Sequence, residues 1–394
     1  MFKKILLGAT ILFTAVSISY YFYFKDLNKP ISIDEFPYNP FENIAFEPEK
    51  LECIEFETKE FAFYLEEPKD FKQNNKFGLY IYAERQDFFE KAAELVNSNG
   101  GSWGYVLIPY NVKDRDSQRW KRVFEDLNRL KLIPVIQLWD VDPENYENQT
   151  RKAAKFLDSF DWPIKQRYIS VYNEVNDKRF WYGKIDPAGY ARILEFTIKT
   201  FKEADEDFMM MNGAFNVSAT NNHETVDSFY YMQKMNEAIP GIFNKLDAWA
   251  AHPYPQPNFS GNPLSKGRWS IRAYEDELNF LKKNLGLKKE LPVFITETGW
   301  AHREGVKEDR SFLSEEKVAE NYKIAFEKVW LKDDRVRAVM PFTIKYNPPF
   351  DHFSWIKDDY KSTYKQFDVI KSLPKVSGKP PSLVKGSIKV PKCN

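Results

Sequence analysis

The chain has 394 residues, of which 43% are hydrophobic and 29% charged, a balance typical of a globular protein with a sizeable core. Its 57 basic and 57 acidic residues give a net charge of zero, which excludes the strongly positive surface that nucleic acid needs. The four scattered histidines and two cysteines have no metal-ligand spacing. We therefore expect no nucleic-acid partner and no metal or other cofactor.

Residues 1–25 have the pattern of a membrane signal. Lys3 and Lys4 precede an uncharged run over 5–24, and about 20 apolar residues can span a bilayer. Lysines before such a run favour an N-terminus in the cytoplasm. The run ends in aromatic residues rather than small ones, which favours an uncleaved anchor over a cleaved signal peptide. Either interpretation places the rest of the chain outside the cytoplasmic membrane, anchored to it or secreted.

Residues 26–75 are predicted to form a linker and a lead-in to the main domain. Four prolines in 26–50 indicate an extended tether, and 51–75 has room for a short strand or two. Cys53 and Cys393 lie just before and just after the main domain. In an oxidising compartment they could form a disulfide that closes the chain ends, and two free thiols are the other alternative.

Residues 76–372 alternate between buried-strand and amphipathic-helix patterns. Eight apolar runs predict strands buried on both faces: 77–83, 103–110, 132–139, 167–173, 208–214, 246–254, 292–300 and 336–344. Helical spacing follows each run: 86–99, 117–132, 148–160, a helix opening at Asp186-Pro187, 226–238, 269–285, 314–332 and 362–373.

Eight such units predict an α/β fold, a closed (β/α)₈ barrel of the TIM type. A doubly wound open sheet is the alternative, but no glycine-rich phosphate loop follows the first strand. The last segment, 373–394, is weakly patterned, and we expect a tail that packs beneath the barrel or stays mobile.

Two glutamates interrupt runs that otherwise read as buried. Glu174 follows the fourth strand directly, and Glu297 ends the seventh within ITETGW. The active site of such a barrel lies at the C-terminal ends of its strands, and strands four and seven lie on opposing sides. Burying an ionised glutamate costs folding free energy, so we expect each of these glutamates to have a functional reason. Hydrolysis of a glycosidic bond supplies one, because it uses one carboxyl as acid and the other as nucleophile or base.

With Asn173-Glu174 at strand four and Glu297 at strand seven, the barrel region resembles clan A of the glycoside hydrolases. The resemblance implies a retaining reaction with Glu174 as acid/base and Glu297 as nucleophile. It also implies that Asn173 contacts the sugar 2-hydroxyl and that Tyr254, or else His252, holds the nucleophile. Many members carry an arginine at the end of strand two. This chain has none there, and Arg85 or the more distant Arg115 is the nearest substitute.

Four tryptophans follow predicted strand ends, where aromatic rings could stack on sugars. We expect this role first for Trp355 and Trp300, then for Trp139 and Trp181. Core packing is the alternative for each.

Three classes of function fit a barrel of this kind. A metal-dependent barrel hydrolase would need His and Asp ligands at several strand ends, and these are sparse. A non-catalytic sugar-binding protein at the cell surface would be expected to lack one glutamate. The sequence therefore favours a glycosidase acting on a poly- or oligosaccharide, and it leaves open the sugar, the linkage, internal or terminal cleavage, and the oligomeric state.

Overall fold

The computed structural model describes residues 55–65 and 73–392. The chain divides into two compact units, residues 1–59 with 389–394 and residues 60–388, and the second unit holds the barrel. No helix among the described residues is both long and apolar enough to cross a membrane. The expected anchor over residues 1–25, most of the linker, and both cysteines lie outside the described residues.

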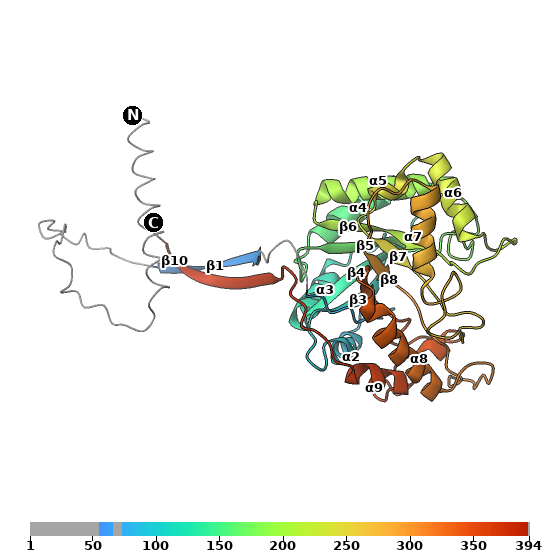
Figure 1. Cartoon of the computed structure of the whole chain (residues 1–394). Helices are drawn as coiled ribbons and strands as arrows, with labels where there is room; N and C mark the ends of the chain where they lie inside the picture. Colours follow the sequence, from blue (N-terminus) through green and yellow to red (C-terminus); the bar gives the residue numbers. More distant parts are fainter. Residues whose placement is uncertain (1–54, 66–72, 393–394) are drawn as a thin grey trace, which may run out of the picture. The chain divides into compact units, whose positions relative to one another are not determined.

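Eight parallel strands form a closed ring, and most of them are labelled in Figure 1. Each lies within one of the eight predicted runs, except that the second strand extends one residue beyond its run. The strands are β2 (Gly78–Tyr80), β3 (Gly104–Asn111), β4 (Leu132–Trp139), β5 (Arg167–Asn173), β6 (Phe208–Ala214), β7 (Trp249–Ala251), β8 (Val293–Ile295) and β9 (Val336–Val339). Strands β2 to β6 form a five-stranded sheet, and β7 to β9 form a three-stranded sheet. Parallel bridges Met211–Ala248 and Phe77–Val339 join the edges of the two sheets. The closed ring excludes a doubly wound open sheet.

The junction between β6 and β7 is sealed by a side chain. The fully buried Asn212 donates from Nδ2 to the Ala250 carbonyl at 3.0 Å and accepts the Ala250 N–H on Oδ1 at 3.0 Å. An amide side chain offers the same donor and acceptor as a peptide group, so it can satisfy buried backbone groups where strand pairing is short.

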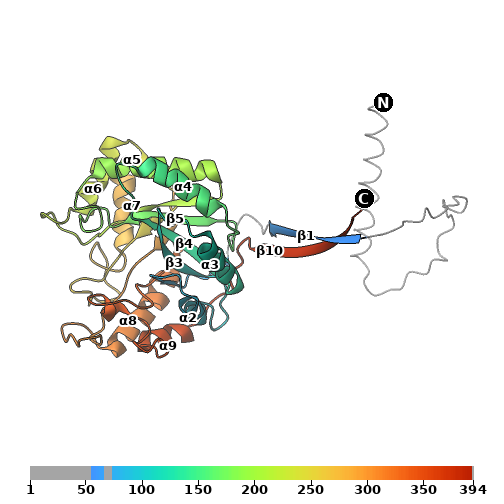
Figure 2. The same cartoon turned by 180° about the vertical axis from the view of Figure 1, so that it is seen from behind.

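A helix follows each strand and covers the outside of the ring, as the sequence predicts (Figure 2). The helices are α2 (Gln86–Val96), α3 (Ser117–Arg129), α4 (Tyr146–Asp158), α5 (Pro187–Ala204), α6 (Ser228–Ala238), α7 (Ala273–Asn284), α8 (Glu315–Lys328) and α9 (Lys365–Ser372). Short 3₁₀ turns are η2 (Ile242–Lys245), η3 (Trp330–Lys332) and η4 (Asp351–Phe353). Asp186 caps α5 by accepting the Gly189 N–H at 2.8 Å, with Pro187 in the first turn.

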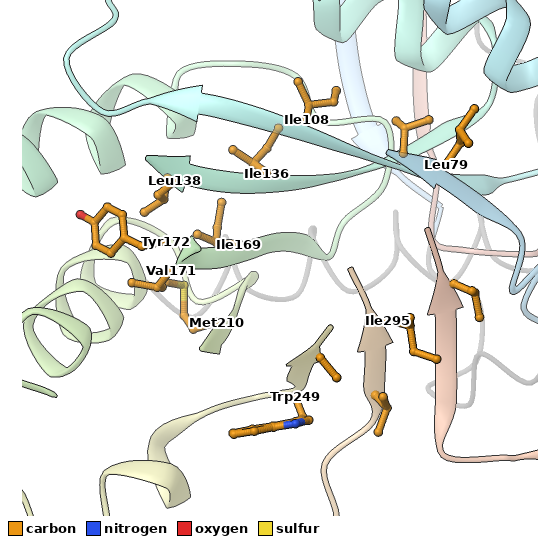
Figure 3. Packing of buried hydrophobic residues seen from close by; sticks show 14 of the residues in the cluster. Leu79, Ile108, Ile136, Leu138, Ile169, Val171, Tyr172, Met210, Trp249 and Ile295 are labelled. Atoms are coloured by element: carbon orange, nitrogen blue, oxygen red, sulfur yellow. The ribbon is translucent and has the colours of Figure 1, made fainter. Parts of the chain in front are cut away.

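The buried side chains form two layers, one on each side of the ring. The outer layer packs between the strands and the helices, and Figure 3 shows members of it from β2 to β8. The inner layer fills the barrel interior. Along β4, Val135 belongs to the inner layer and Ile136 to the outer layer. Because side chains alternate along a strand, Gln137 and Trp139 also face inward, at the end of β4 where the barrel opens.

Two further strands, β1 (Glu55–Tyr64) and β10 (Leu383–Lys392), pair with each other. The Leu65 N–H donates to the Ser382 carbonyl at 3.1 Å, where β1 ends and β10 begins, so the two strands run antiparallel. The strand expected within 51–75 is thus present. The end of the chain, expected as a weakly patterned tail, contributes a ten-residue strand instead, because β1 supplies the backbone partners that its own sequence does not indicate.

Candidate active site

Glu174 lies immediately after β5, where the backbone is strained. Tyr172 and Glu174 have φ angles of +73° and +38°, in the left-handed region that non-glycine residues rarely occupy. The Glu174 N–H donates to the Ala214 carbonyl at 2.9 Å, and its own carbonyl accepts the Asp177 N–H at 2.8 Å. Such strain persists only where the surroundings hold it, and it is concentrated at functional sites.

Glu297 lies two residues after β8, between two threonines that fix the backbone. The hydroxyls of Thr296 and Thr298 donate to the carbonyls of Ala251 and Pro253, at 3.4 and 2.8 Å. These bonds attach the segment to the end of β7. Gly299 follows with φ of +155°, and a Cβ there would lie 2.4 Å from the Tyr322 hydroxyl. Glycine is therefore required beside the glutamate.

The two glutamates meet at one imidazole. His252 Nδ1 lies 3.1 Å from Glu174 Oε1 and 3.7 Å from Glu297 Oε2. Those two oxygens are therefore no farther apart than the sum of these distances, 6.8 Å. The Tyr254 hydroxyl donates to Glu297 Oε2 at 3.0 Å. Of the two residues named for holding Glu297, Tyr254 is hydrogen-bonded to it, whereas His252 is within hydrogen-bond distance of Glu174 and not of Glu297.

Burial dominates the electrostatics of this group. It raises the pKa of Glu297 to about 7, and the charge of Glu174 acts in the same direction, while His252 and the Tyr254 hydroxyl oppose it. Burial lowers the pKa of His252, but the charges of Glu297 and Glu174 outweigh it, so this pKa lies above its usual value.

A cleft of about 770 Å³ opens beside the glutamates. It is lined by the ends of β2 to β5, by the segment after β5 and by Tyr346 beyond β9. Asn173 forms part of its wall, and Gln137 Nε2 donates to Asn173 Oδ1 at 3.1 Å. Gln137 was missed in the sequence, although a polar residue inside an apolar strand was a readable signal. Tyr80 and Tyr346, which also line the cleft, gave no such signal.

Two of the four expected tryptophan platforms belong to the core. Trp300 and Trp355 are buried, and both rings pack against Tyr322 of α8, so neither presents a face for a sugar. Trp181 borders the cleft, but its ring is also buried, between Tyr172 and Tyr190. The expectation of exposed rings at these three positions is therefore corrected. Trp139 alone of the four lines the cleft with an exposed side chain.

The two substitute arginines do not contact the glutamates. Arg85 forms an exposed ion pair with Asp87. Arg115 donates to the Tyr110 hydroxyl at 2.8 Å. Across the described ranges 55–65 and 73–392, no cluster of three or more His, Cys, Asp or Glu side chains is arranged to hold a metal ion.

No protein-family profile and no curated protein sequence matches this chain. Solved structures do match it. A GH128 (subgroup II) endo-β-1,3-glucanase from Pseudomonas viridiflava is similar over 77% of this chain and 99% of its own, with 14% identity and a TM-score of 0.51. An endo-laminarinase from Formosa Hel1_33_131 is similar over 79% of this chain and 92% of its own, with 15% identity and a TM-score of 0.52. The chain therefore has the barrel fold found in these glycoside hydrolases.

Proposed function

We propose that the chain is a retaining glycoside hydrolase, with Glu297 as nucleophile and Glu174 as acid/base. The observation that carries the proposal is the pair of carboxyls facing one imidazole, with oxygens no more than 6.8 Å apart, the sum of their distances to His252 Nδ1. Retaining enzymes place their carboxyl groups about 5–5.5 Å apart, whereas inverting ones need about 6.5–9.5 Å to admit a water. This upper limit admits the retaining separation and reaches only the lower edge of the inverting range.

The roles of the two glutamates follow the resemblance to clan A, and the reaction is a double displacement. The Glu297 carboxylate attacks the anomeric carbon while the bond to the leaving oxygen breaks, and Glu174 gives that oxygen its proton. Glu174, now ionised, then takes a proton from water, whose oxygen displaces Glu297 from the sugar. The Tyr254 hydroxyl, 3.0 Å from Glu297 Oε2, stabilises the ionised nucleophile, and His252 faces both carboxyls.

The test compares wild type with Glu297→Gln and with Glu206→Gln, an exposed control just beyond the end of α5. A β-1,3-glucan is the first substrate to assay because one of the similar structures is named an endo-β-1,3-glucanase. The Glu297→Gln variant should lose at least about a thousandfold in turnover, a loss on the scale of removing a nucleophile. NMR of the first product should show the anomeric configuration of the substrate. Normal turnover by Glu297→Gln would reject the assignment, and an inverted product would reject retention.

The location of the enzyme is part of the proposal. Residues 5–24 are uncharged and follow two lysines, which supports an anchor that holds the barrel outside the cytoplasmic membrane. The full chain should sediment with membranes through an alkaline wash, while a chain starting at residue 26 should stay in solution. A full chain released by the wash would rule out an anchor.

A further inference from the structure

The cleft continues away from the two glutamates. Asn173 is in its wall, but neither Glu174 nor Glu297 lines it, so the cleft starts beside the pair and extends along the ends of β4, β3 and β2. Its volume of about 770 Å³ lies in the upper part of the range, roughly 300–1,000 Å³, of sites for drug-sized ligands. One sugar ring at the glutamates would leave this space empty.

Exposed aromatic faces line the cleft. Trp139, Phe180 and Tyr182 are 48%, 44% and 41% exposed, unlike the buried tryptophans of the core. Gln137 and Trp139 lie on the same face of β4, and two residues along a strand span about 7 Å. Gln137 contacts Asn173 beside the catalytic pair, so Trp139 stands one step farther out. Rigid aromatic faces in a hollow suit the apolar face of a sugar ring.

The charges of the cleft argue against an anionic ligand. Arg119 is ion-paired with Asp114, and Arg179 with the buried Asp177. An arginine whose charge is balanced by a carboxylate attracts an anionic sugar less than an unpaired cation does. Glu84 also lines the cleft, and within the described ranges its side chain makes no hydrogen bond or ion pair with another residue. A carboxyl of this kind accepts hydrogen bonds from hydroxyl groups and repels carboxylates.

We propose that this cleft binds two or more consecutive units of an uncharged glycan, with one ring stacked on Trp139 and hydroxyl groups bound to Glu84. The proposal rests on the proposed function for the reaction at the glutamates, but binding in the cleft does not require turnover. Binding of consecutive units makes a glycan chain, rather than a single terminal sugar, the substrate. Bonds inside a polysaccharide are then the ones presented to Glu174 and Glu297.

Binding is measured on Glu297→Gln, so that the ligands stay intact, by calorimetry with oligosaccharides of two to six units. The panel contains β-1,3- and β-1,4-linked glucose, β-1,4-linked mannose and xylose, and β-1,4-linked uronic acid as the charged counterpart. We expect at least one neutral series to bind more tightly with each added unit. Adding Trp139→Ala should weaken the six-unit ligand about tenfold and leave the two-unit ligand less affected. Trp269→Ala is the matched control, because Trp269 is 63% exposed and does not line the cleft.

A second variant tests the role of charge. Glu84→Gln keeps the size of the side chain and removes its charge. The ratio of the affinity for neutral ligands to the affinity for uronic-acid ligands should therefore fall. Failure of every neutral series to bind, tighter binding of the uronic acid, or equal effects of the two tryptophan variants would overturn the proposal. If wild type binds the oligosaccharides but does not hydrolyse them, the cleft assignment stands and the proposed reaction is rejected. Hydrolysis by wild type, with no increase in affinity as sugar units are added, would support the proposed reaction and reject the cleft assignment.

Discussion

Replacing the buried nucleophile should make the protein more stable at alkaline pH. Glu297 is 8% exposed, and burial raises its pKa from the usual 4.5 to about 7. As the pH rises, this carboxyl ionises in the unfolded chain before it ionises in the folded protein. Wild-type stability therefore falls between about pH 4.5 and 7 and stays low above that range. The difference is worth about 3 kcal/mol. Glu297→Gln carries no charge to bury, so it should be more stable than wild type by up to about 3 kcal/mol at pH 8 and similar near pH 5.

Thermal unfolding at pH 5, 6.5 and 8 measures this effect. For a barrel of this size a gain of about 3 kcal/mol corresponds to a rise in Tm of about 4 °C. The pKa of about 7 already includes the attraction of His252 and the hydrogen bond of Tyr254, so the 3 kcal/mol is a net value. Glu206→Gln, at an exposed position, should show no pH-dependent gain. A gain for Glu297→Gln that is the same at pH 5 and pH 8, or a loss at pH 8, would refute the reasoning.

Three further predictions concern other contacts. Tyr254→Phe removes the hydroxyl that donates to Glu297 Oε2. The pKa of the acidic limb in the pH profile of kcat/KM should therefore rise by about one unit, and kcat should fall. An unchanged pH profile would contradict this role of Tyr254. Asn212→Ala leaves the N–H and carbonyl of Ala250 unpaired, so urea unfolding should show a loss of about 2–4 kcal/mol that the exposed Asn284→Ala does not share. Cys53 and Cys393 flank the paired strands β1 and β10 in sequence, so we expect a disulfide in protein made under oxidising conditions; labelling of both thiols without prior reduction would count against it.

The barrel was predictable because its signals are local. Each strand is buried on both faces, and each helix carries an apolar stripe, so the alternation of the two patterns is readable along the chain. The bounds were less predictable. The run 246–254 forms only the short strand Trp249–Ala251, because His252 keeps a single parallel bridge to Asn216 and Pro253 and Tyr254 leave the sheet. The strand β10 was not predicted, since its partner β1 lies more than 300 residues away in the sequence.

The candidate site was predictable to a different degree for its two kinds of residue. Glu174 and Glu297 stand out because charge in an apolar run is rare, and their common position at strand ends implies that they meet. The tryptophans carry no such signal, because a loop's path decides which way a ring points. Trp300 and Trp355 come from different loops and both pack on Tyr322, a contact that depends on the placement of α8.

The closure of the ring has a mechanical consequence. Glu174 follows a strand of the five-stranded sheet, and Glu297 follows a strand of the three-stranded sheet. The cleft is built mainly by the five-stranded half. A glycan in the cleft would be bound by the five-stranded half of the barrel, while Glu297 would attack it from the three-stranded half. The side chain of Asn212, which seals one junction between the halves, therefore helps to set the distance of attack, and a misplacement of about 1 Å can cost a hundredfold in rate.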